Sequence, residues 1–481
     1  MTGQITISIW FFILLVIIAV LALLDRILIP STRWFFRRRI NRVIDEIGTR
    51  LDIEIRPFQL TKRQVLIDRL VFDSKVVEEI QNHARQHDMP LEVVQKKVVS
   101  YAREIVPSFN AYLYFRIGYW FAKKIARLLY RVRVGKIEDE QYLSIDPDST
   151  VVFVMNHRSN MDYVLVAFLA AERTTLSYAV GEWAKIWPLQ MLIRAMGAFF
   201  VRRNSGNPLY RRVLERYIHM ATREGVCQAV FLEGGLSRDG RLQPPKLGLM
   251  DYMLRRFDPA TDRDVVFIPV GINYDRTLED RSLLRTFDPD AEKRGWWFVC
   301  RTTFRFIRRS LVLMILSRWR RYGYACVNFG SPLSAKAYCL DQGLNFSRLP
   351  RAERFPEIAK LCHRLMAAIS DVVPILPVSL MSTVFLDAMD TELDILDIEE
   401  RSNRLINELQ ALGAPVFEMS RSARAHDIVD AVDLMTMRRM VTASGDQFKA
   451  VSAEEAMMRY YANTIGHWRQ DERTFGTLLR D

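Results

Sequence analysis

The pattern of hydrophobic and polar positions divides the chain into four parts. The first part is an uncharged apolar run. The second and the fourth parts have apolar residues at helical spacing, and the third part alternates between short apolar segments and helical segments. We therefore predict a transmembrane anchor at 1–30, a helical N-terminal region at 31–139, an α/β domain at 140–335 and a helical C-terminal region at 336–481.

The apolar run at the N-terminus has the length of a membrane-spanning helix. No charged residue precedes Asp25, and residues 5–24 supply about the 20 residues that cross a bilayer. A collar of basic and aromatic residues follows: Arg26, Arg33, Trp34, Phe35, Phe36, Arg37, Arg38, Arg39 and Arg42. This arrangement predicts one N-terminal transmembrane helix with the rest of the chain in the cytoplasm. A hydrophobic helix lying in the membrane plane is the alternative.

Short segments rich in β-branched and aromatic residues predict the strands of the α/β domain. They lie at 151–155 (VVFVM), 229–235 (AVFLEGG, strand then turn), 265–274 (VVFIPVGINY) and 323–330 (GYACVNFG), with a helix expected at 161–171. Strands separated by helices are typical of a central, mostly parallel sheet with flanking helices. Ligands bind beyond the carboxyl ends of such strands, which is where the polar clusters NHRSNMD and EGGLSRDGR stand.

Composition narrows the partners of this fold. The chain has 481 residues, 49% of them hydrophobic, and a net charge of +12, so its surface suits nucleic acid, anionic lipid or a phosphorylated substrate. Segment 301–321 places arginines around an apolar centre, as in a basic amphipathic helix on a membrane or a helix packed on the core. Five cysteines without a CxxC pair indicate a reducing compartment. His83 and His87 fit a solvated helix face better than a metal site, so we expect no metal.

The cluster NHRSNMD contains a histidine and an aspartate five residues apart. His157 is able to take a proton near neutral pH, and the carboxylate of Asp162 is able to fix its tautomer across a strand-to-helix turn. A plain polar turn is the alternative. Ser159 and Asn160 are candidate contacts to a substrate.

Three further clusters follow in order. GAFFVRR ends in Arg202 and Arg203, which are able to hold a phosphate or are plain surface charge. FLEGGLSRDGR lets the backbone approach a ligand at its two glycines and offers groups for a hydroxylated, phosphorylated molecule: Gly234, Gly235, Glu233, Ser237, Arg238 and Arg241. FIPVGINYD places Pro269 inside a strand, which predicts a sheet edge or a bulge beside a site.

Together the four clusters resemble the motifs of the glycerolipid acyltransferases. The HX4D motif of that family matches His157 and Asp162, and the other three motifs match Gly197, Phe200 and Arg203, then Phe231, Glu233 and Gly234, then Ile268, Pro269 and Val270. NHRSNMDY, the double arginine and EGGLSRDGRLQPPKLG, with its Lys246, are most similar to the bacterial membrane-bound glycerol-3-phosphate 1-O-acyltransferases. RYYANTIGHW (459–468) resembles the same subgroup less specifically.

This resemblance implies a reaction and roles for residues. The 1-hydroxyl of glycerol 3-phosphate would attack the thioester of acyl-CoA or acyl-carrier protein, the co-substrate, with His157 as base and Asp162 as its orienter and with no cofactor. Arg202, Arg203, Arg238 and Arg241, with Lys246, would hold the phosphate; Glu233 and Ser237 would bind hydroxyls; and N–H groups at Gly234–Gly235 or in the helix after His157 would support the oxyanion. The family usually has arginine where Leu236 stands.

The resemblance also implies a place in the cell and leaves two alternatives. Membership of the bacterial subgroup predicts the cytoplasmic face of the inner membrane, with anionic lipids as partners and no nucleic acid. One alternative is an acyltransferase of the same superfamily acting on lysophosphatidate, another lysophospholipid or dihydroxyacetone phosphate. The other is a non-catalytic protein that binds anionic lipid, for which the set His157, Asp162 and Glu233 would be unnecessary.

Overall fold

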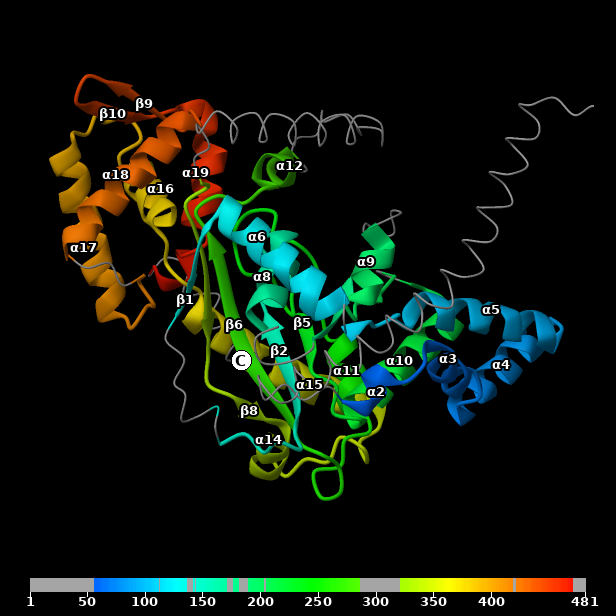
Figure 1. Cartoon of the computed structure of the whole chain (residues 1–481). Helices are drawn as coiled ribbons and strands as arrows, with labels where there is room; N and C mark the ends of the chain where they lie inside the picture. The colour runs from blue at the N-terminus through cyan, green and yellow to red at the C-terminus, as the bar shows by residue number, and fades with distance from the viewer. Residues whose placement is uncertain are drawn as a thin grey trace, which may run out of the picture.

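The structure of the chain is a computed structural model (Figure 1). It describes residues 56–111, 113–135, 142, 144–170, 176–180, 189–202, 205–285, 321–417 and 421–469. The predicted anchor at 1–30 and all but the last residue of the basic segment at 301–321 lie outside this part of the chain. Among the helices that are described, none is long and apolar enough to cross a membrane.

The core of the described chain is an eight-stranded sheet. Its strands are β1 (Arg131–Val134), β2 (Thr150–Met155), β3 (Ser177–Val180), β4 (Phe199–Phe200), β5 (Gln228–Phe231), β6 (Val265–Tyr274), β7 (Tyr324–Phe329) and β8 (Leu333–Ser334). They lie in the order β1-β7-β6-β2-β5-β3-β4, with β8 beside β6. Strands β6, β2, β5, β3 and β4 are mutually parallel, whereas β7 and β8 run antiparallel to β6. The predicted α/β fold with a mostly parallel sheet is confirmed.

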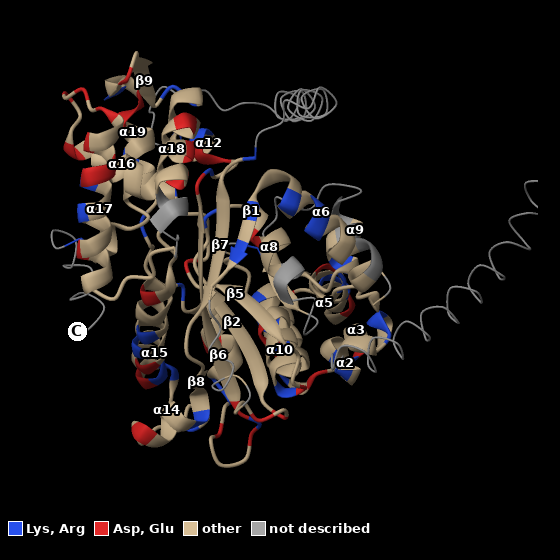
Figure 2. Ribbon diagram, turned by 60° about the vertical axis from the view of Figure 1, so that its left-hand side comes forward, with Lys and Arg blue, Asp and Glu red and all other residues tan. Residues whose placement is uncertain are grey.

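Nearly all charge is excluded from these strands because helices bury both faces of the sheet. Of the eight strands, β1 at the edge alone carries charged residues, as Figure 2 shows. This strand lies inside the stretch 31–139 that the sequence predicts to be helical, and that prediction is wrong for β1. Its alternating arginines and valines pair with β7 in parallel register, from Arg131 opposite Tyr324 to Val134 opposite Val327.

Pro269 lies in the middle of the sheet, so the expected edge or bulge is wrong. Strand β6 pairs continuously with β2 on one side, with Pro269 opposite Val154. On its other side β6 pairs first with β8, up to Phe267, and then with β7, from Val270 onward. Pro269 occupies the gap between these two partners, where its missing N–H breaks no ladder hydrogen bond. Its carbonyl accepts the N–H of Gly330 at 2.8 Å.

Helices cover the sheet on both faces (Figure 1). On one face, α6 (Tyr119–Leu129) packs on α8 (Met161–Ala170); on the other lie α10 (Pro208–Arg223), α11 (Gly248–Leu254) and α15 (Arg351–Val372). Successive side chains of β2 point to opposite faces of the sheet and so pack in both helical layers. Val152 and Val154 join the cluster of α10 and α15, and Met155 joins the cluster of α6 and α8.

The N-terminal helices pack against α10. They are α2 (Pro57–Leu60), α3 (Arg63–Val71), α4 (Ser74–Gln86) and α5 (Leu91–Ile105), followed by a π-helical segment (Leu113–Gly118). In α4, Val76, Ile80 and Ala84 are buried four residues apart, the spacing of one helix face. These helices therefore extend one layer of the α/β domain and share its hydrophobic core.

The C-terminal region has its own hydrophobic core. Buried residues of α16 (Pro377–Asp387), α17 (Ile395–Ala411), α18 (Arg421–Met437) and α19 (Glu455–Ala462) form this cluster. A two-stranded hairpin, β9 (Val441–Ser444) and β10 (Gln447–Ala450), lies within this region, which the sequence predicts to be mainly helical. Its turn contains Gly445 at φ 60°, a conformation that favours glycine.

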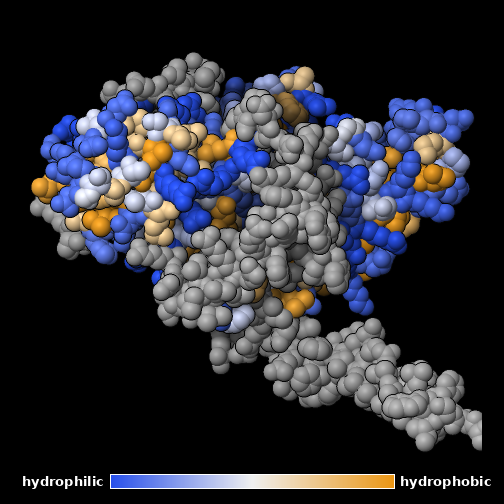
Figure 3. Space-filling model, turned by 90° about the horizontal axis from the view of Figure 1, so that it is seen from above, coloured by the Kyte–Doolittle hydropathy of each residue, from blue (hydrophilic) through white to orange (hydrophobic). Residues whose placement is uncertain are grey.

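Short helices complete the described part. They are α9 (Leu189–Ala195), α12 (Asp280–Leu284) after β6, and α14 (Ala335–Asp341) after β8. Helices α12 and α14 lie at opposite ends of the sheet, because β6 runs from one end to the other (Figure 1). Seen from above, the described surface is mainly hydrophilic, with hydrophobic residues in scattered patches (Figure 3).

Candidate functional site

Residues 156–162, which we call the histidine turn, connect β2 to α8 at the carboxyl end of the sheet. Its first residue ties two strands together. The side-chain amide of Asn156 donates to the carbonyl of Ile272 at 2.9 Å, and its oxygen accepts the N–H of Ile272 at 2.8 Å. The start of the turn is therefore fixed to β6 as firmly as a ladder pair would fix it.

The structure brings His157 and Asp162 together. The Nδ1 atom of His157 lies 2.9 Å from Oδ2 of Asp162, and the two residues are 1% and 0% exposed. The same carboxylate oxygen accepts the backbone N–H groups of Arg158 at 2.8 Å and Ser159 at 3.0 Å. Because the carboxylate only accepts, Nδ1 carries the proton and the lone pair of the imidazole is on Nε2.

Tyr274 completes the environment of this carboxylate. Its hydroxyl, at the end of β6, donates to Oδ1 of Asp162 at 2.6 Å. Burial first, and then the charge of Asp162, hold the pKa of Tyr274 well above its usual value, so the phenol stays a donor. Asp162 thus has hydrogen bonds on both oxygens, so neither oxygen of this buried side chain lacks a partner.

The imidazole of His157 is enclosed by aromatic rings. Phe231, at the end of β5, stacks on it with centroids 3.9 Å apart, and Tyr163 meets it edge-on at 5.4 Å. Among the described residues, Nε2 of His157 has no hydrogen-bond partner. A buried imidazole with one nitrogen held by a carboxylate and the other unengaged is the arrangement of a general base.

Glu233 links the histidine turn to the segment after β5, residues 233–246, which we call the glycine loop. Its Oε2 accepts the backbone N–H of His157 at 3.4 Å, whereas Oε1 has no partner within the described chain. Burial raises the pKa of Glu233 to about 8, although the nearby Arg158 opposes the rise. At neutral pH the carboxyl is therefore largely protonated and able to donate a hydrogen bond.

The glycines after Glu233 leave room for neighbouring groups. Gly234 has φ 68°, and a Cβ atom there would lie 2.7 Å from Cγ of Lys246, so the stem of this lysine runs beside the turn. The N–H of Gly234 donates to the carbonyl of Phe231 at 2.9 Å. The N–H of Gly235 has no acceptor among the described residues.

Ser237 holds the glycine loop in shape. Its hydroxyl donates to the carbonyl of Arg241 at 2.7 Å, its N–H donates to the carbonyl of His157 at 2.9 Å, and the side chain is fully buried. The structure therefore does not offer Ser237 as a direct substrate contact. The cations Arg238, Arg241 and Lys246 are exposed on the same loop.

Leu236 packs against the C-terminal cluster rather than facing solvent. It is partly buried beside the core of α16, α18 and α19. At this position an apolar side chain joins the glycine loop to the C-terminal region. The usual arginine of the family would place a charge in that contact.

Of the two arginines after β4 that the sequence predicts to hold a phosphate, the structure describes Arg202 but not Arg203. Arg202 binds both carboxylate oxygens of Glu104, at 2.9 and 2.6 Å, and lies over the rings of Tyr101 and Tyr210. Its charge is matched by Glu104, and β4 is the edge strand farthest from β2 on its side of the sheet. The structure does not bring Arg202 to the site, and the prediction that it holds the phosphate is wrong for this arrangement. Arg203 lies outside the described residues.

The sequence interpretation also placed Ser159 and Asn160 against a substrate, and the structure assigns them elsewhere. Both donate to the carboxylate of Glu279, a residue that no motif had marked. Tyr274 was likewise missed, because the sequence does not show that β6 lies next to β2. Phe231 stood inside the third motif, but nothing in the sequence showed that it stacks on His157.

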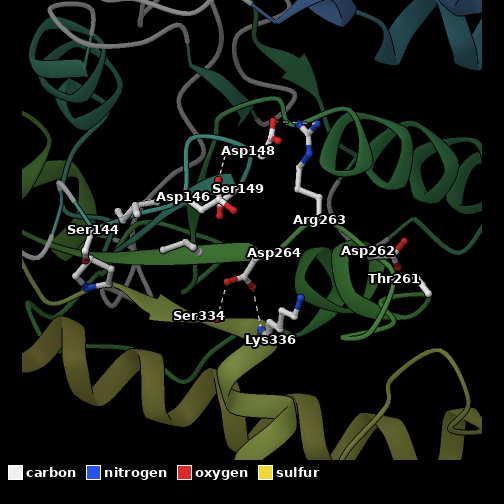
Figure 4. Close-up of a pocket in the computed structure, with 13 residues that line it drawn as sticks. Ser144, Asp146, Asp148, Ser149, Thr261, Asp262, Arg263, Asp264, Ser334 and Lys336 are labelled. Atoms are coloured by element: carbon white, nitrogen blue, oxygen red, sulfur yellow. Dashed lines mark hydrogen bonds and ion pairs between the residues drawn. The ribbon is translucent and has the colours of Figure 1, made fainter.

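A polar cavity lies away from these residues (Figure 4). It has a volume of about 790 Å³ and is lined by residues at the amino ends of β2 and β6, among them Asp148 and Arg263, and by Lys336 of α14. Asp264 at its wall accepts the hydroxyl of Ser334 at 2.6 Å and the N–H of Lys336 at 2.9 Å, so it joins the sheet to α14. None of the predicted site residues lines this cavity.

Two family models match the chain. Residues 135–273 match the family described as "Acyltransferase", and residues 310–469 match "Glycerol-3-phosphate acyltransferase C-terminal region". The first match contains the histidine turn and the glycine loop. The second contains α15 to α19.

Curated relatives carry the name "Glycerol-3-phosphate acyltransferase". The protein of Aeromonas hydrophila is 26% identical over 85% of this chain and 50% of its own length. The protein of Pseudomonas entomophila is 27% identical over 85% of this chain and 49% of its own length. The protein of Pseudomonas putida strain W619 is 31% identical over 59% of this chain and 33% of its own length. A solved 1-acyl-sn-glycerophosphate acyltransferase from Thermotoga maritima is 18% identical, with a TM-score of 0.30 over 53% of this chain and 78% of that one. The chain spans about half the length of the first two relatives. The predicted resemblance to glycerol-3-phosphate acyltransferases is confirmed.

Proposed function

We propose, from this similarity to glycerol-3-phosphate acyltransferases, that the chain transfers a fatty acyl group from a thioester to the 1-hydroxyl of glycerol 3-phosphate. The observation that carries the proposal is the buried pair of His157 and Asp162, with Nδ1 and Oδ2 2.9 Å apart and Nε2 unengaged within the described chain. The donor is acyl-CoA or acyl-carrier protein, and the product is lysophosphatidate.

In the first step His157 acts as base. Its Nε2 takes the proton of the acceptor hydroxyl while the oxygen attacks the carbonyl carbon of the thioester, forming a tetrahedral intermediate. Asp162 stabilises the imidazolium that results, and a positioned base of this kind contributes about 10²- to 10⁴-fold in rate. In the second step the carbon–sulfur bond breaks, and the thiolate takes the proton from Nε2. His157 then returns to its starting state.

The glycine loop supplies the groups that face the new charge. Within the described chain, the N–H groups of residues 157–162 are engaged by Glu233, Asp162, Glu279 and Ser159, and the backbone donor that we propose for the oxyanion is the N–H of Gly235 in the glycine loop. One such donor contributes roughly 3–4 kcal/mol to the transition state. The protonated carboxyl of Glu233, beside His157, donates to the oxyanion or to an acceptor hydroxyl.

Exposed cations bind the phosphate of the acceptor. The stem of Lys246 runs beside Gly234, which supports a role of this lysine at the turn of the glycine loop. Arg238 and Arg241 stand on the same loop, and Arg203 is the last residue of the second motif. A dianionic phosphate suits several of these groups because arginine pairs bind it bidentately.

The membrane is the place of action in this proposal. An apolar helix at 1–30 would anchor the chain in the bacterial inner membrane with the site on the cytoplasmic side, where anionic lipids meet its basic surfaces. The acyl chain and the lipid product both need an apolar route. A net charge of +12 also suits an acidic carrier protein as the donor.

A purified-enzyme assay with one labelled acyl donor tests the proposal. The chain is offered glycerol 3-phosphate, lysophosphatidate, another lysophospholipid and dihydroxyacetone phosphate in parallel. We expect the highest kcat/KM with glycerol 3-phosphate. Higher turnover of another acceptor would support an acyltransferase of the same superfamily with that acceptor. Salt-sensitive binding to anionic lipid without any turnover would support a non-catalytic lipid-binding protein.

A further inference from the structure

Glu279, at the N-terminal end of α12, reaches across to the histidine turn. Its Oε2 accepts the hydroxyl of Ser159 at 2.7 Å. Its Oε1 accepts both the backbone N–H and the side-chain amide of Asn160, at 3.2 and 3.0 Å. One carboxylate thus holds two consecutive residues that lie between His157 and Asp162.

Together with the bonds to Asp162, these hydrogen bonds hold the histidine turn from two sides. On one side Asp162 accepts the N–H groups of Arg158 and Ser159. On the other side Glu279 holds Ser159, whose oxygen also accepts the N–H of Met161 at 3.1 Å. The path of the backbone between the base and its carboxylate is therefore determined by a residue more than a hundred positions away in sequence.

The C-terminal helices fix the segment that carries Glu279. The next residue, Asp280, is buried and accepts from Arg438, which follows α18, and from the hydroxyl of Tyr461 in α19. The same tyrosine oxygen accepts the N–H of Thr277 at 3.1 Å. Both ends of the segment 277–280 are thus tied to the C-terminal region.

We infer that Glu279 is a positioning residue for the histidine turn and that the C-terminal helices set its place through Asp280 and Tyr461. The inference rests on the proposed role of His157 as base. A base must present Nε2 to the acceptor hydroxyl within a few tenths of an ångström, and a misplacement of about 1 Å costs about 10²-fold in rate. The C-terminal region would in this way be needed for turnover without touching the substrates.

The test compares Glu279→Ala, Glu279→Gln and a matched control in the full chain. Gln keeps an oxygen for Asn160 and an amide for Ser159, whereas Ala removes both contacts. Glu215→Ala is the control, because Glu215 is also buried and paired, with Arg212 at 2.6 Å and Arg255 at 2.9 Å, but lies in α10. Hydrogen exchange of residues 157–162 and the kinetic constants are measured for each.

We expect faster exchange of the histidine turn in Glu279→Ala, with kcat lowered about 100-fold and both KM values nearly unchanged. Glu279→Gln should restore most of the protection and of kcat. Glu215→Ala should leave the exchange of the turn and the turnover of the folded protein as in the wild type. If Glu279 only stabilised the fold, the exchange of residues 157–162 and kcat would change in Glu279→Ala no more than in Glu215→Ala.

Two results would overturn the inference: unchanged exchange of the turn in Glu279→Ala, or faster exchange with unchanged kcat. The exchange measurement needs no substrate, so it decides the positioning role even if glycerol 3-phosphate proves not to be the acceptor. Tyr461→Phe tests the link to the C-terminal region, since it removes the hydroxyl that binds Asp280 and Thr277. We expect a smaller rise in exchange than in Glu279→Ala, and no rise would exclude that link.

Discussion

The histidine turn and the glycine loop lie side by side at the carboxyl end of the sheet but are built differently. In the histidine turn the carboxylate of Asp162 is held by hydrogen bonds from four residues, His157, Arg158, Ser159 and Tyr274. In the glycine loop the cations Arg238, Arg241 and Lys246 are exposed. The proposed base is preformed, whereas the cations proposed to bind the acceptor are presented to solvent.

This difference follows from what each part must do. A base has to be held in one tautomer and one place, which requires buried bonds from several elements. A phosphate is recognised by charge, and flexible cations at the surface attract it before it is bound. We therefore expect changes in the turn to affect kcat and changes in the loop to affect KM for the acceptor.

The largest effect is expected from His157→Ala. Loss of the group that carries the proton in both steps should lower kcat by about 10⁴-fold, the upper end for general acid–base catalysis. The variant should still fold, because the imidazole is held by a hydrogen bond at one nitrogen only. A labelled-acyl assay on the purified variant measures this, and near-normal turnover would refute the assignment of the base.

Asp162→Asn should lower kcat by about 10³-fold and also destabilise the fold. The amide would donate toward Nδ1 and favour the tautomer that has its proton on Nε2, which cannot act as a base. The backbone N–H groups of Arg158 and Ser159 would lose a charged acceptor, at a cost of about 1–3 kcal/mol in the free energy of unfolding. Denaturation and kinetics together check both parts. Unchanged turnover would show that His157 needs no orienter.

Glu233→Gln should change how stability depends on pH. Burial raises the pKa of Glu233 from 4.5 to about 8, so between these values the folded state holds a proton that the unfolded state releases. Stability of the wild type therefore falls as pH rises from 5 to 8, by an amount on the order of a few kcal/mol from this group. Gln cannot titrate, so the variant should gain stability relative to the wild type over that range. The free energy of unfolding is measured for both proteins at pH 5 and pH 8. The same difference between variant and wild type at both pH values would contradict the raised pKa of Glu233.

Arg203→Ala should have the smallest effect and act on KM. Loss of a charge-assisted hydrogen bond of about 1.5–3 kcal/mol predicts a 10- to 100-fold higher KM for glycerol 3-phosphate, with KM for the acyl donor unchanged. Arg202→Ala is the matched control, because its guanidinium is bound to Glu104 and should leave both KM values as they are. Equal effects of Arg203→Ala on both substrates would count against a phosphate role.

Much of the fold was predictable from local pattern. The strands β2, β5, β6 and β7 fall on the apolar segments named from the sequence, because buried parallel strands are continuous runs of β-branched and aromatic residues. Strand β1 was missed because its arginines and valines fit a helix as well as an edge strand. The hairpin of β9 and β10 was missed because short, partly exposed strands have a weak hydrophobic pattern.

The candidate site was predictable where its residues stand close together in sequence. His157 and Asp162 are five positions apart, so a single turn brings them into contact. Arg202 was misassigned because nothing near it in sequence shows that Glu104 in α5 would bind it. Ser237 was misassigned because its spacing from Glu233 does not show whether a hydroxyl faces a ligand or the carbonyl of Arg241.

The sequence by itself determined the alternation of strands and helices and the pairing of His157 with Asp162, because these depend on periodicity and short spacing. Only the tertiary structure decided which cations are exposed and which residues hold His157 and Asp162 in place. Tyr274, Glu279 and Tyr461 come from separate elements, and their bonds exist only once the sheet and the C-terminal helices have packed. Long-range contacts of this kind leave no local pattern, since each needs only one suitable side chain at the right place in space.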